Sequence, residues 1–226
     1  MSPRSSAAWL VAACLLAGRA GAEAPRYEIE DALVVRETAQ GTRHSVDVRV
    51  VRYFLAHVAK HAGSYPPRFE NPRQRPEVER EARGLIAIFD VLLEPQPTDP
   101  GLLLDAGFAY AMGHNLDLPG SAKKAIETFD ALLREHPDHA LGNYRYGAFL
   151  AGTARLQEKS VPYLKAAAEL GIADALYTLG VVHVSQGRAQ RGLAYLEEYL
   201  DRNPDSERTR GMIQALRDGH VEYRRE

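Results

Sequence analysis

The chain of 226 residues is poor in cysteine, and its only one, Cys14, lies close to the amino terminus. No disulfide can form within the chain, so packing has to supply its stability. The 28 basic and 30 acidic residues leave a formal net charge of −2, so an excess of positive charge is also missing. Nucleic acid is therefore not an expected partner.

The sequence also lacks the short motifs that mark common catalytic sites. It has no phosphate-binding glycine loop, no dinucleotide-binding glycine motif and no nucleophile elbow. These absences leave no reaction class to propose. We therefore expect a non-catalytic protein, and we expect no cofactor.

Two histidines have the spacing of a metal-binding pair but lack the rest of such a site. His57 and His61 are four residues apart, which places both on one face of a helix. Val58 stands where a zinc-protease helix has its glutamate, and no third ligand is identifiable. We interpret the pair as solvated helix residues and predict no metal site.

Residues 1–22 have the features of a signal peptide. Arg4 precedes an apolar run from Ala7 to Gly18, and Ala20-Gly21-Ala22 fits a small-x-small cleavage site. The run is too short to cross a bilayer comfortably, so no membrane span is expected. We expect cleavage after Ala22 and export of the chain, with the periplasm as its location.

A second processing route stays open at the same segment. Val11-Ala12-Ala13-Cys14 resembles a bacterial lipobox, which would make Cys14 a lipid-bearing amino terminus. The apolar run continues through Leu15 and Leu16, whereas a lipidated terminus is usually followed by polar residues. The sequence therefore favours a periplasmic or secreted chain over a lipoprotein.

A repeated phrase organises the rest of the chain. In each copy a large apolar residue stands eight places before a proline, and a second one stands five places before it. A helix brings positions three and four apart onto one face, so this spacing describes the buried stripe of a helix that stops before a proline. The copies are Phe89-Asp90-Val91-Leu92-Leu93 before Pro97, Phe129-Asp130-Ala131-Leu132-Leu133 before Pro137, and Leu196-Glu197-Glu198-Tyr199-Leu200 before Pro204.

Apolar periodicity and turn residues divide the chain into four segments after the signal peptide. The segment 23–44 could hold a short strand or an extended, loosely ordered arm. Ser45 is a candidate cap for the first helix, and Ser160 for a later one. The predicted segments are the arm 23–44, a degenerate first helix pair in 45–97 (helices 45–62 and 77–93), three pairs in 98–204 (102–112 with 121–134, 140–151 with 161–169, 174–185 with 190–201), and a capping helix and tail in 205–226.

The chain resembles tetratricopeptide-repeat proteins. Gly107-Phe108-Ala109-Tyr110, followed by Ala125-x-x-x-Phe129, matches the small and large positions of that pattern. The stretch 165–180, with its alanines, Gly171 and Leu179-Gly180, is more similar to a Sel1-like junction. No unit has the tryptophan of the pattern, and Leu150 and His183 stand where its tyrosine is expected. The resemblance implies an all-α, right-handed superhelix of stacked antiparallel helix pairs with a C-terminal capping helix.

The resemblance also implies a concave surface that binds a protein or peptide. Two tyrosines one repeat apart could hold an extended peptide, although their rings could instead merely cover the edges of the core. The lysines of the known clamp for peptide carboxylates are missing, so that specificity is not expected. The positions that the pattern places in the groove are Phe108, Asn143, Tyr144, Ala148, Tyr177 and Val181.

The turn from Gly113 to Gly120 is the most individual part of the sequence, being about six residues longer than the repeat pattern expects. His114, Asn115 and Asp117 bring three polar groups into it, and inserted loops often carry function. A small-ligand or metal site is therefore the alternative to a protein-binding adaptor of the cell envelope. The competing interpretation is an Ω-like turn in which these groups satisfy the backbone and Leu116 is tucked under.

Overall fold

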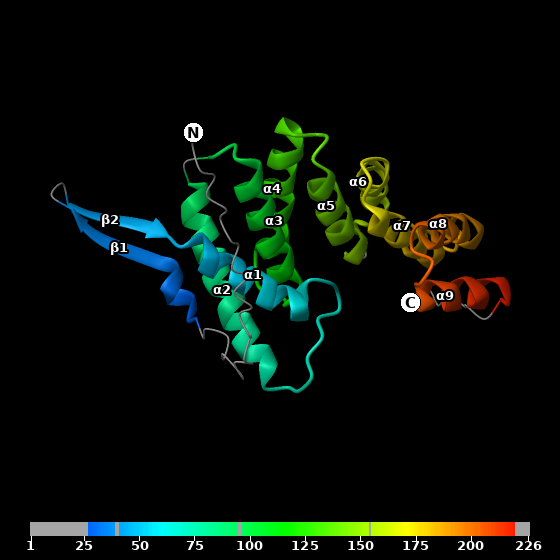
Figure 1. Ribbon diagram of the computed structural model, residues 1–226, viewed down its shortest axis with the longest axis horizontal. Helices are drawn as coiled ribbons and strands as arrows, with labels where there is room; N and C mark the ends of the chain where they lie inside the picture. The colour runs from blue at the N-terminus through cyan, green and yellow to red at the C-terminus, as the bar shows by residue number, and fades with distance from the viewer. Residues whose placement is uncertain (1–26, 39–40, 95, 154, 220–226) are drawn as a thin grey trace, which may run out of the picture.

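The computed structural model describes residues 27–38, 41–94, 96–153 and 155–219. The proposed signal peptide and Cys14 lie outside these residues. Within them, eight helices form four antiparallel pairs, and a ninth helix follows at the carboxyl end (Figure 1). The pairs are α1 (Val48–Ala62) with α2 (Gln74–Leu93), α3 (Pro100–Asn115) with α4 (Ser121–Glu135), α5 (Ala140–Gly152) with α6 (Gln157–Glu169), and α7 (Ala173–Ser185) with α8 (Ala189–Arg202); the last helix is α9 (Glu207–Arg217).

The small and large positions of the sequence pattern meet at equivalent helix crossings. At each crossing a glycine of the first helix faces a large side chain of the second. A Cβ atom added to the glycine would lie only 2.6–2.8 Å from that side chain, so the helices approach as closely as glycine allows. The expectation of stacked helix pairs is confirmed. The facing residues are Gly107 with Phe129, Gly147 with Leu164, and Gly180 with Leu196.

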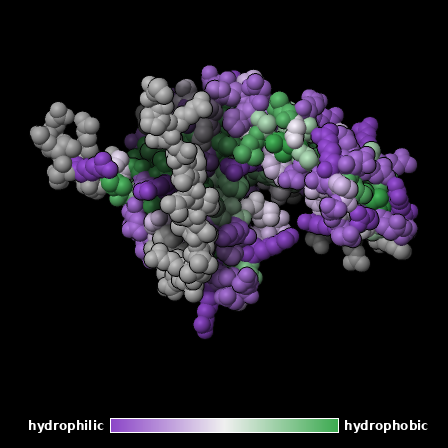
Figure 2. All heavy atoms as spheres, in the orientation of Figure 1, coloured by the Kyte–Doolittle hydropathy of each residue, from purple (hydrophilic) through white to green (hydrophobic). Residues whose placement is uncertain are grey.

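The first helices of successive pairs also lie beside one another. Helix α1 contacts α3, α3 contacts α5, and α5 contacts α7. One hydrophobic core runs from the start of the described chain to Leu150, and a smaller one, around Leu164 and Leu179, joins the last two pairs. Figure 2 shows a mainly hydrophilic surface with hydrophobic residues gathered around α5 and α6.

Two predicted caps are wrong, because other groups begin those helices. Asp47 caps α1 by accepting from the amide of Arg49 at 2.9 Å, and hydrogen bonds from Arg49 lower the pKa of Asp47 to about 2. Ser45 lies instead in a strand. Helix α6 starts at Gln157, so Ser160 sits inside its first turn, where its hydroxyl donates to the Gln157 carbonyl.

The segment before α1 forms a hairpin rather than a loose arm. Strands β1 (Leu33–Thr38) and β2 (Gly41–Val46) pair antiparallel, with Leu33 opposite Val46. A short 3₁₀-helix, η1 (Ile29–Ala32), precedes them and buries Ile29 against Gly84 of α2. This contact fastens the amino-terminal segment to the first helix pair and covers its apolar edge.

Among the described residues, none of the helices combines the length and the apolar character that crossing a bilayer requires.

Candidate functional site

The inserted turn between α3 and α4 is shorter than the sequence indicates. Helix α3 continues to Asn115, so His114 and Asn115 belong to its last turn and the connection is only Leu116 to Gly120. Leu116 is 1% exposed, and Asp117 has a φ of +61°, as an aspartate in a tight turn can adopt. The polar residues of the turn therefore lie in a compact, packed structure.

Each of the three polar residues in this region contacts a neighbouring helix pair. The Asn115 side-chain amide donates to the Ala62 carbonyl at 2.8 Å, and Asp117 accepts from Arg75 at 2.9 Å. The His114 ring packs edge-on against Phe149 at a centroid distance of 5.5 Å. Because these groups point to three different elements, they do not converge on a common ligand.

The histidine pair of α1 is likewise engaged with protein groups. His57 Nδ1 lies 2.6 Å from the buried carboxylate of Glu81, and His61 Nδ1 lies 3.0 Å from the Arg68 carbonyl. Within the described ranges, no three histidine, cysteine, aspartate or glutamate side chains are grouped closely enough to hold a metal ion.

The first helices α3, α5 and α7 present a row of half-buried groups. The Arg145 guanidinium of α5 stacks over the Phe108 ring of α3, with 3.9 Å between the guanidinium carbon and the ring centroid. Its Nη1 atom lies 3.7 Å from a carboxylate oxygen of Asp105, beyond hydrogen-bond distance, and is buried without a hydrogen-bond partner. The Arg145 guanidinium is thus held against the Phe108 ring, and its Nη1 donor has no hydrogen-bond partner.

Burial disfavours the charged forms of both members of this pair. Burial raises the pKa of Asp105, and the positive charges of Arg145 and Arg52 oppose the rise. Burial lowers the pKa of Arg145, and Asp105 opposes that change. The pair therefore does not fully offset its own desolvation, and an additional carboxylate or carbonyl oxygen at Arg145 would be favourable.

The two predicted groove tyrosines follow along the same row. Tyr144 packs against the smaller core, and burial, followed by the charge of Asp174, raises the pKa of its hydroxyl. The Tyr177 ring lies 5.5 Å from that of Tyr199, and the Arg208 guanidinium carbon lies 5.2 Å from its centroid. Both rings contact the array itself and keep part of their surface exposed.

The remaining predicted groove residues differ in accessibility. Ala148 and Val181 are partly exposed on α5 and α7. Asn143 is only 4% exposed, and its amide nitrogen lies 2.8 Å from the Pro137 carbonyl and 3.2 Å from that of His139. The Asn143 amide nitrogen is already hydrogen-bonded to carbonyls at the start of α5, so it is not free to bind a partner.

The aspartates of the repeated phrase tie successive pairs together, a role that the sequence analysis missed. Asp90 of α2 accepts from the Tyr110 hydroxyl at 2.9 Å and from Lys124 Nζ at 2.6 Å. Asp130 of α4 accepts from the Tyr146 hydroxyl at 2.9 Å. The signal available in the sequence was the repetition of aspartate directly after phenylalanine.

These ties predict a loss of stability in alkali. Burial and then the hydrogen-bonded aspartate raise the pKa values of Tyr110 and Tyr146 above the ordinary value of 10.0, so the folded state retains protons that the unfolded state releases. The contribution is complete below pH 10.0 and is lost as the pH rises from there toward the folded-state pKa values. We expect the urea midpoint of the natural chain to fall more steeply above pH 10.0 than that of a Tyr110→Phe/Tyr146→Phe variant. Parallel curves would contradict this assignment.

Comparisons with known proteins agree with the geometry of the array. Residues 174–206 match the tetratricopeptide repeat (TPR) family. A search of curated protein sequences finds no match.

The chain also resembles solved structures of TPR solenoids. It aligns with the crystal structure of MamA at a TM-score of 0.54 and 21% identity, covering 68% of this chain and 86% of the other. The structure of a MamA RS-1 ArsTM double mutant aligns at a TM-score of 0.53 and 19% identity, covering 76% of this chain and 86% of the other. The thermophilic TPR protein TTC0263 of Thermus thermophilus aligns at a TM-score of 0.52 and 16% identity, covering 74% of this chain and 88% of the other. The fold is that of a TPR solenoid, a right-handed superhelix of stacked helix pairs.

Proposed function

We propose that the chain is a non-catalytic adaptor that binds an extended segment of a partner protein along α3, α5 and α7. The observation that carries this proposal is the Arg145 guanidinium, which is stacked over Phe108 and has a buried donor without a partner. Tyr144 and Tyr177 continue the row with partly exposed rings. Rigid aromatic and arginine side chains of this kind are the groups that dominate protein interfaces.

The row also indicates the chemistry of the partner. A carboxylate or carbonyl oxygen of the bound segment would take the free donor of Arg145, while aromatic faces pack against its apolar atoms. Asp105 beside Arg145 accepts hydrogen bonds, so a backbone amide of the same segment can be held there. The partner segment is thus an extended peptide with at least one acceptor placed opposite α5.

The leader segment supports an envelope location for this adaptor. Cleavage after Ala22 would give a periplasmic or secreted chain, whereas lipidation at Cys14 would anchor it. Mass measurement of the mature protein separates these outcomes, because a chain that starts at Glu23 carries no lipid, whereas a lipoprotein begins with modified Cys14.

Crosslinking mass spectrometry in intact cells tests the adaptor function. We expect the natural chain to crosslink one partner reproducibly, with the crosslinks closest to α3, α5 and α7. A Tyr144→Ala/Tyr177→Ala variant should lose at least about tenfold of that yield, because aromatic anchors contribute about 2 kcal/mol or more each at interfaces.

Tyr65→Ala is the matched control, since Tyr65 is 60% exposed and lies in the loop after α1. It should retain the natural yield. The proposal would be abandoned if the double variant, folded by circular dichroism, captured the same proteins as the natural chain.

A further inference from the structure

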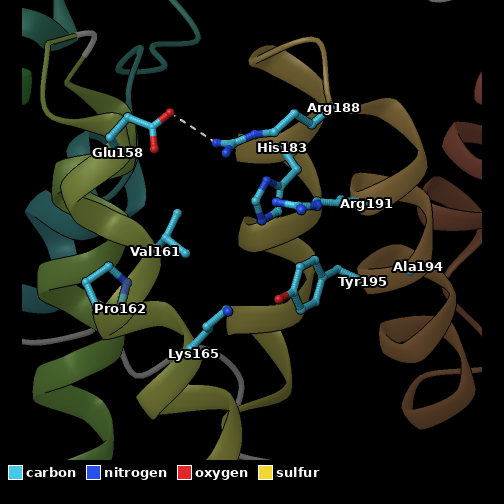
Figure 3. A pocket seen from close by; sticks show the side chains of 9 residues that line it. All are labelled: Glu158, Val161, Pro162, Lys165, His183, Arg188, Arg191, Ala194 and Tyr195. Atoms are coloured by element: carbon cyan, nitrogen blue, oxygen red, sulfur yellow. Dashed lines mark hydrogen bonds and ion pairs between the residues drawn. The ribbon is translucent and has the colours of Figure 1, made fainter.

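A recess lies between the second helices of the last two pairs. It has a volume of about 660 Å³ and opens between α6 and α8, with α7 as its floor (Figure 3). Three cationic side chains enter it, against one carboxylate. The cations are Lys165, Arg188 and Arg191, the carboxylate is Glu158, and the other lining residues are Val161, Pro162, His183, Ala194 and Tyr195.

The recess lies at the junction of the third and fourth pairs. At the equivalent place in the junction of the first and second pairs, Asp90 accepts hydrogen bonds from Tyr110 and Lys124 and so forms an internal tie. In that tie, Asp90 directly follows Phe89, Tyr110 lies three residues after Gly107, and Lys124 lies five residues before Phe129. Counting from the equivalent residues Leu164, Gly180 and Leu196, the same places hold Lys165, His183 and Arg191. The carboxylate that binds a hydroxyl and an ammonium in the earlier tie is thus replaced by a third basic group.

The buried histidine of the recess has a polar atom without a partner. His183 is 4% exposed, its ring stacks on Tyr195 with an interplanar angle of 4°, and Nδ1 makes no hydrogen bond. Figure 3 shows its imidazole pointing into the space between α6 and α8. A buried donor or acceptor left unpaired costs free energy, so a ligand that supplies its partner is stabilised.

The surrounding charges oppose protonation of this imidazole and leave the cations incompletely neutralised. Burial lowers the pKa of His183, and Arg188, Arg191 and Lys165 lower it further, against the smaller effect of Glu158. Glu158 accepts from Arg188 Nη2 at 3.1 Å, but its side chain is 75% exposed. Arg188 Nε is buried without a partner. Lys165 and Arg191 have no ion pair with this carboxylate.

We propose that this recess binds a compact small-molecule anion, a carboxylate or a phosphate, which takes the place of the missing aspartate. One oxygen of the ligand lies between Lys165 and Arg191, as the Asp90 carboxylate does between Tyr110 and Lys124. Another accepts from His183 Nδ1, whose neutral imidazole carries its proton on that nitrogen. The aliphatic wall formed by Val161, Pro162 and Ala194 contacts the carbon skeleton of a carboxylate ligand.

Isothermal titration of the purified protein with citrate, and separately with inorganic phosphate, at constant ionic strength tests the proposal. We expect saturable one-to-one binding of at least one of the two anions, and the tighter one identifies the chemical class. Arg191→Gln should weaken that binding about tenfold, because a hydrogen bond to a charged group is lost. Lys165→Asp should abolish it and raise the thermal midpoint, because the new carboxylate restores the internal tie.

Lys159→Gln is the matched control, because Lys159 stands five residues before Leu164, the same spacing at which Arg191 precedes Leu196, but lies outside the recess. Its affinity should stay within about twofold of the natural value, as expected for a surface substitution. A second readout is the NMR titration of His183, whose pKa should rise when the anion is bound. Absence of saturable binding by both anions, or equal binding by the natural chain and a folded Lys165→Asp variant, overturns the proposal.

Discussion

Replacing Phe129 with alanine is expected to lower the free energy of unfolding by about 3–5 kcal/mol, the range for truncating a buried aromatic side chain. Phe129 is fully buried, faces the Cα of Gly107, and stacks on Tyr146 of the next pair at a centroid distance of 5.2 Å. The cavity would therefore open both within the second pair and at its junction with the third. Urea unfolding followed by circular dichroism measures the loss.

Val91→Ala provides the control for this prediction. Val91 is also a helical apolar residue of a repeated phrase, but it is 65% exposed, so its truncation should change stability by no more than about 0.5 kcal/mol. Equal effects of the two substitutions would show that Phe129 does not hold the crossing together.

Gly180→Val is expected to destabilise the last helix pair by about 1–3 kcal/mol, since overpacking a close crossing forces backbone or rotamer shifts. A Cβ at Gly180 would lie 2.6 Å from Leu196 Cγ and 3.1 Å from the carbonyl oxygen of Gly192. Gly192 faces the same crossing from α8, with its own Cβ position 2.8 Å from the Gly180 carbonyl oxygen. Because backbone stands on both sides, the strain cannot be relieved by one side chain alone.

Gly211→Ala tests whether glycine removal is harmful in itself. Gly211 lies in α9 with no heavy atom within 4 Å of its Cβ position, so alanine should raise stability by about 0.5–1 kcal/mol through helix propensity. Hydrogen exchange would then localise the Gly180→Val effect to α7 and α8. A uniform effect on all helix pairs would argue against a local clash.

The sequence predicted more of the candidate groove than of the anion recess. The repeat pattern placed Phe108, Tyr144 and Tyr177 on the first helices, where the structure shows a half-buried row. It did not show that Arg145 covers Phe108 or that the Asn143 amide is already bonded. The repeat pattern identified His183 as a departure from the expected tyrosine. It did not predict that Lys165 and Arg191 line the same recess as His183.

Local pattern alone determined the helices and their crossings in this protein. The 3.6-residue period of a helix fixes which positions share a face, so a small residue on one helix and a bulky one on the next identify the crossing before any coordinates exist. Gly107 with Phe129 and Gly180 with Leu196 meet for this reason.

Tertiary structure alone decided the partners of the polar side chains. Which polar groups meet across successive pairs depends on the rotation of each pair against the last, and this rotation comes from the summed packing of many side chains. Asp90 therefore bonds to Tyr110. In the next pair the position equivalent to Tyr110 is Leu150, and Asp130 bonds instead to Tyr146, four residues earlier. The same rotation brings Lys165, Arg191 and His183 to one recess, where His183 Nδ1 has no hydrogen-bond partner.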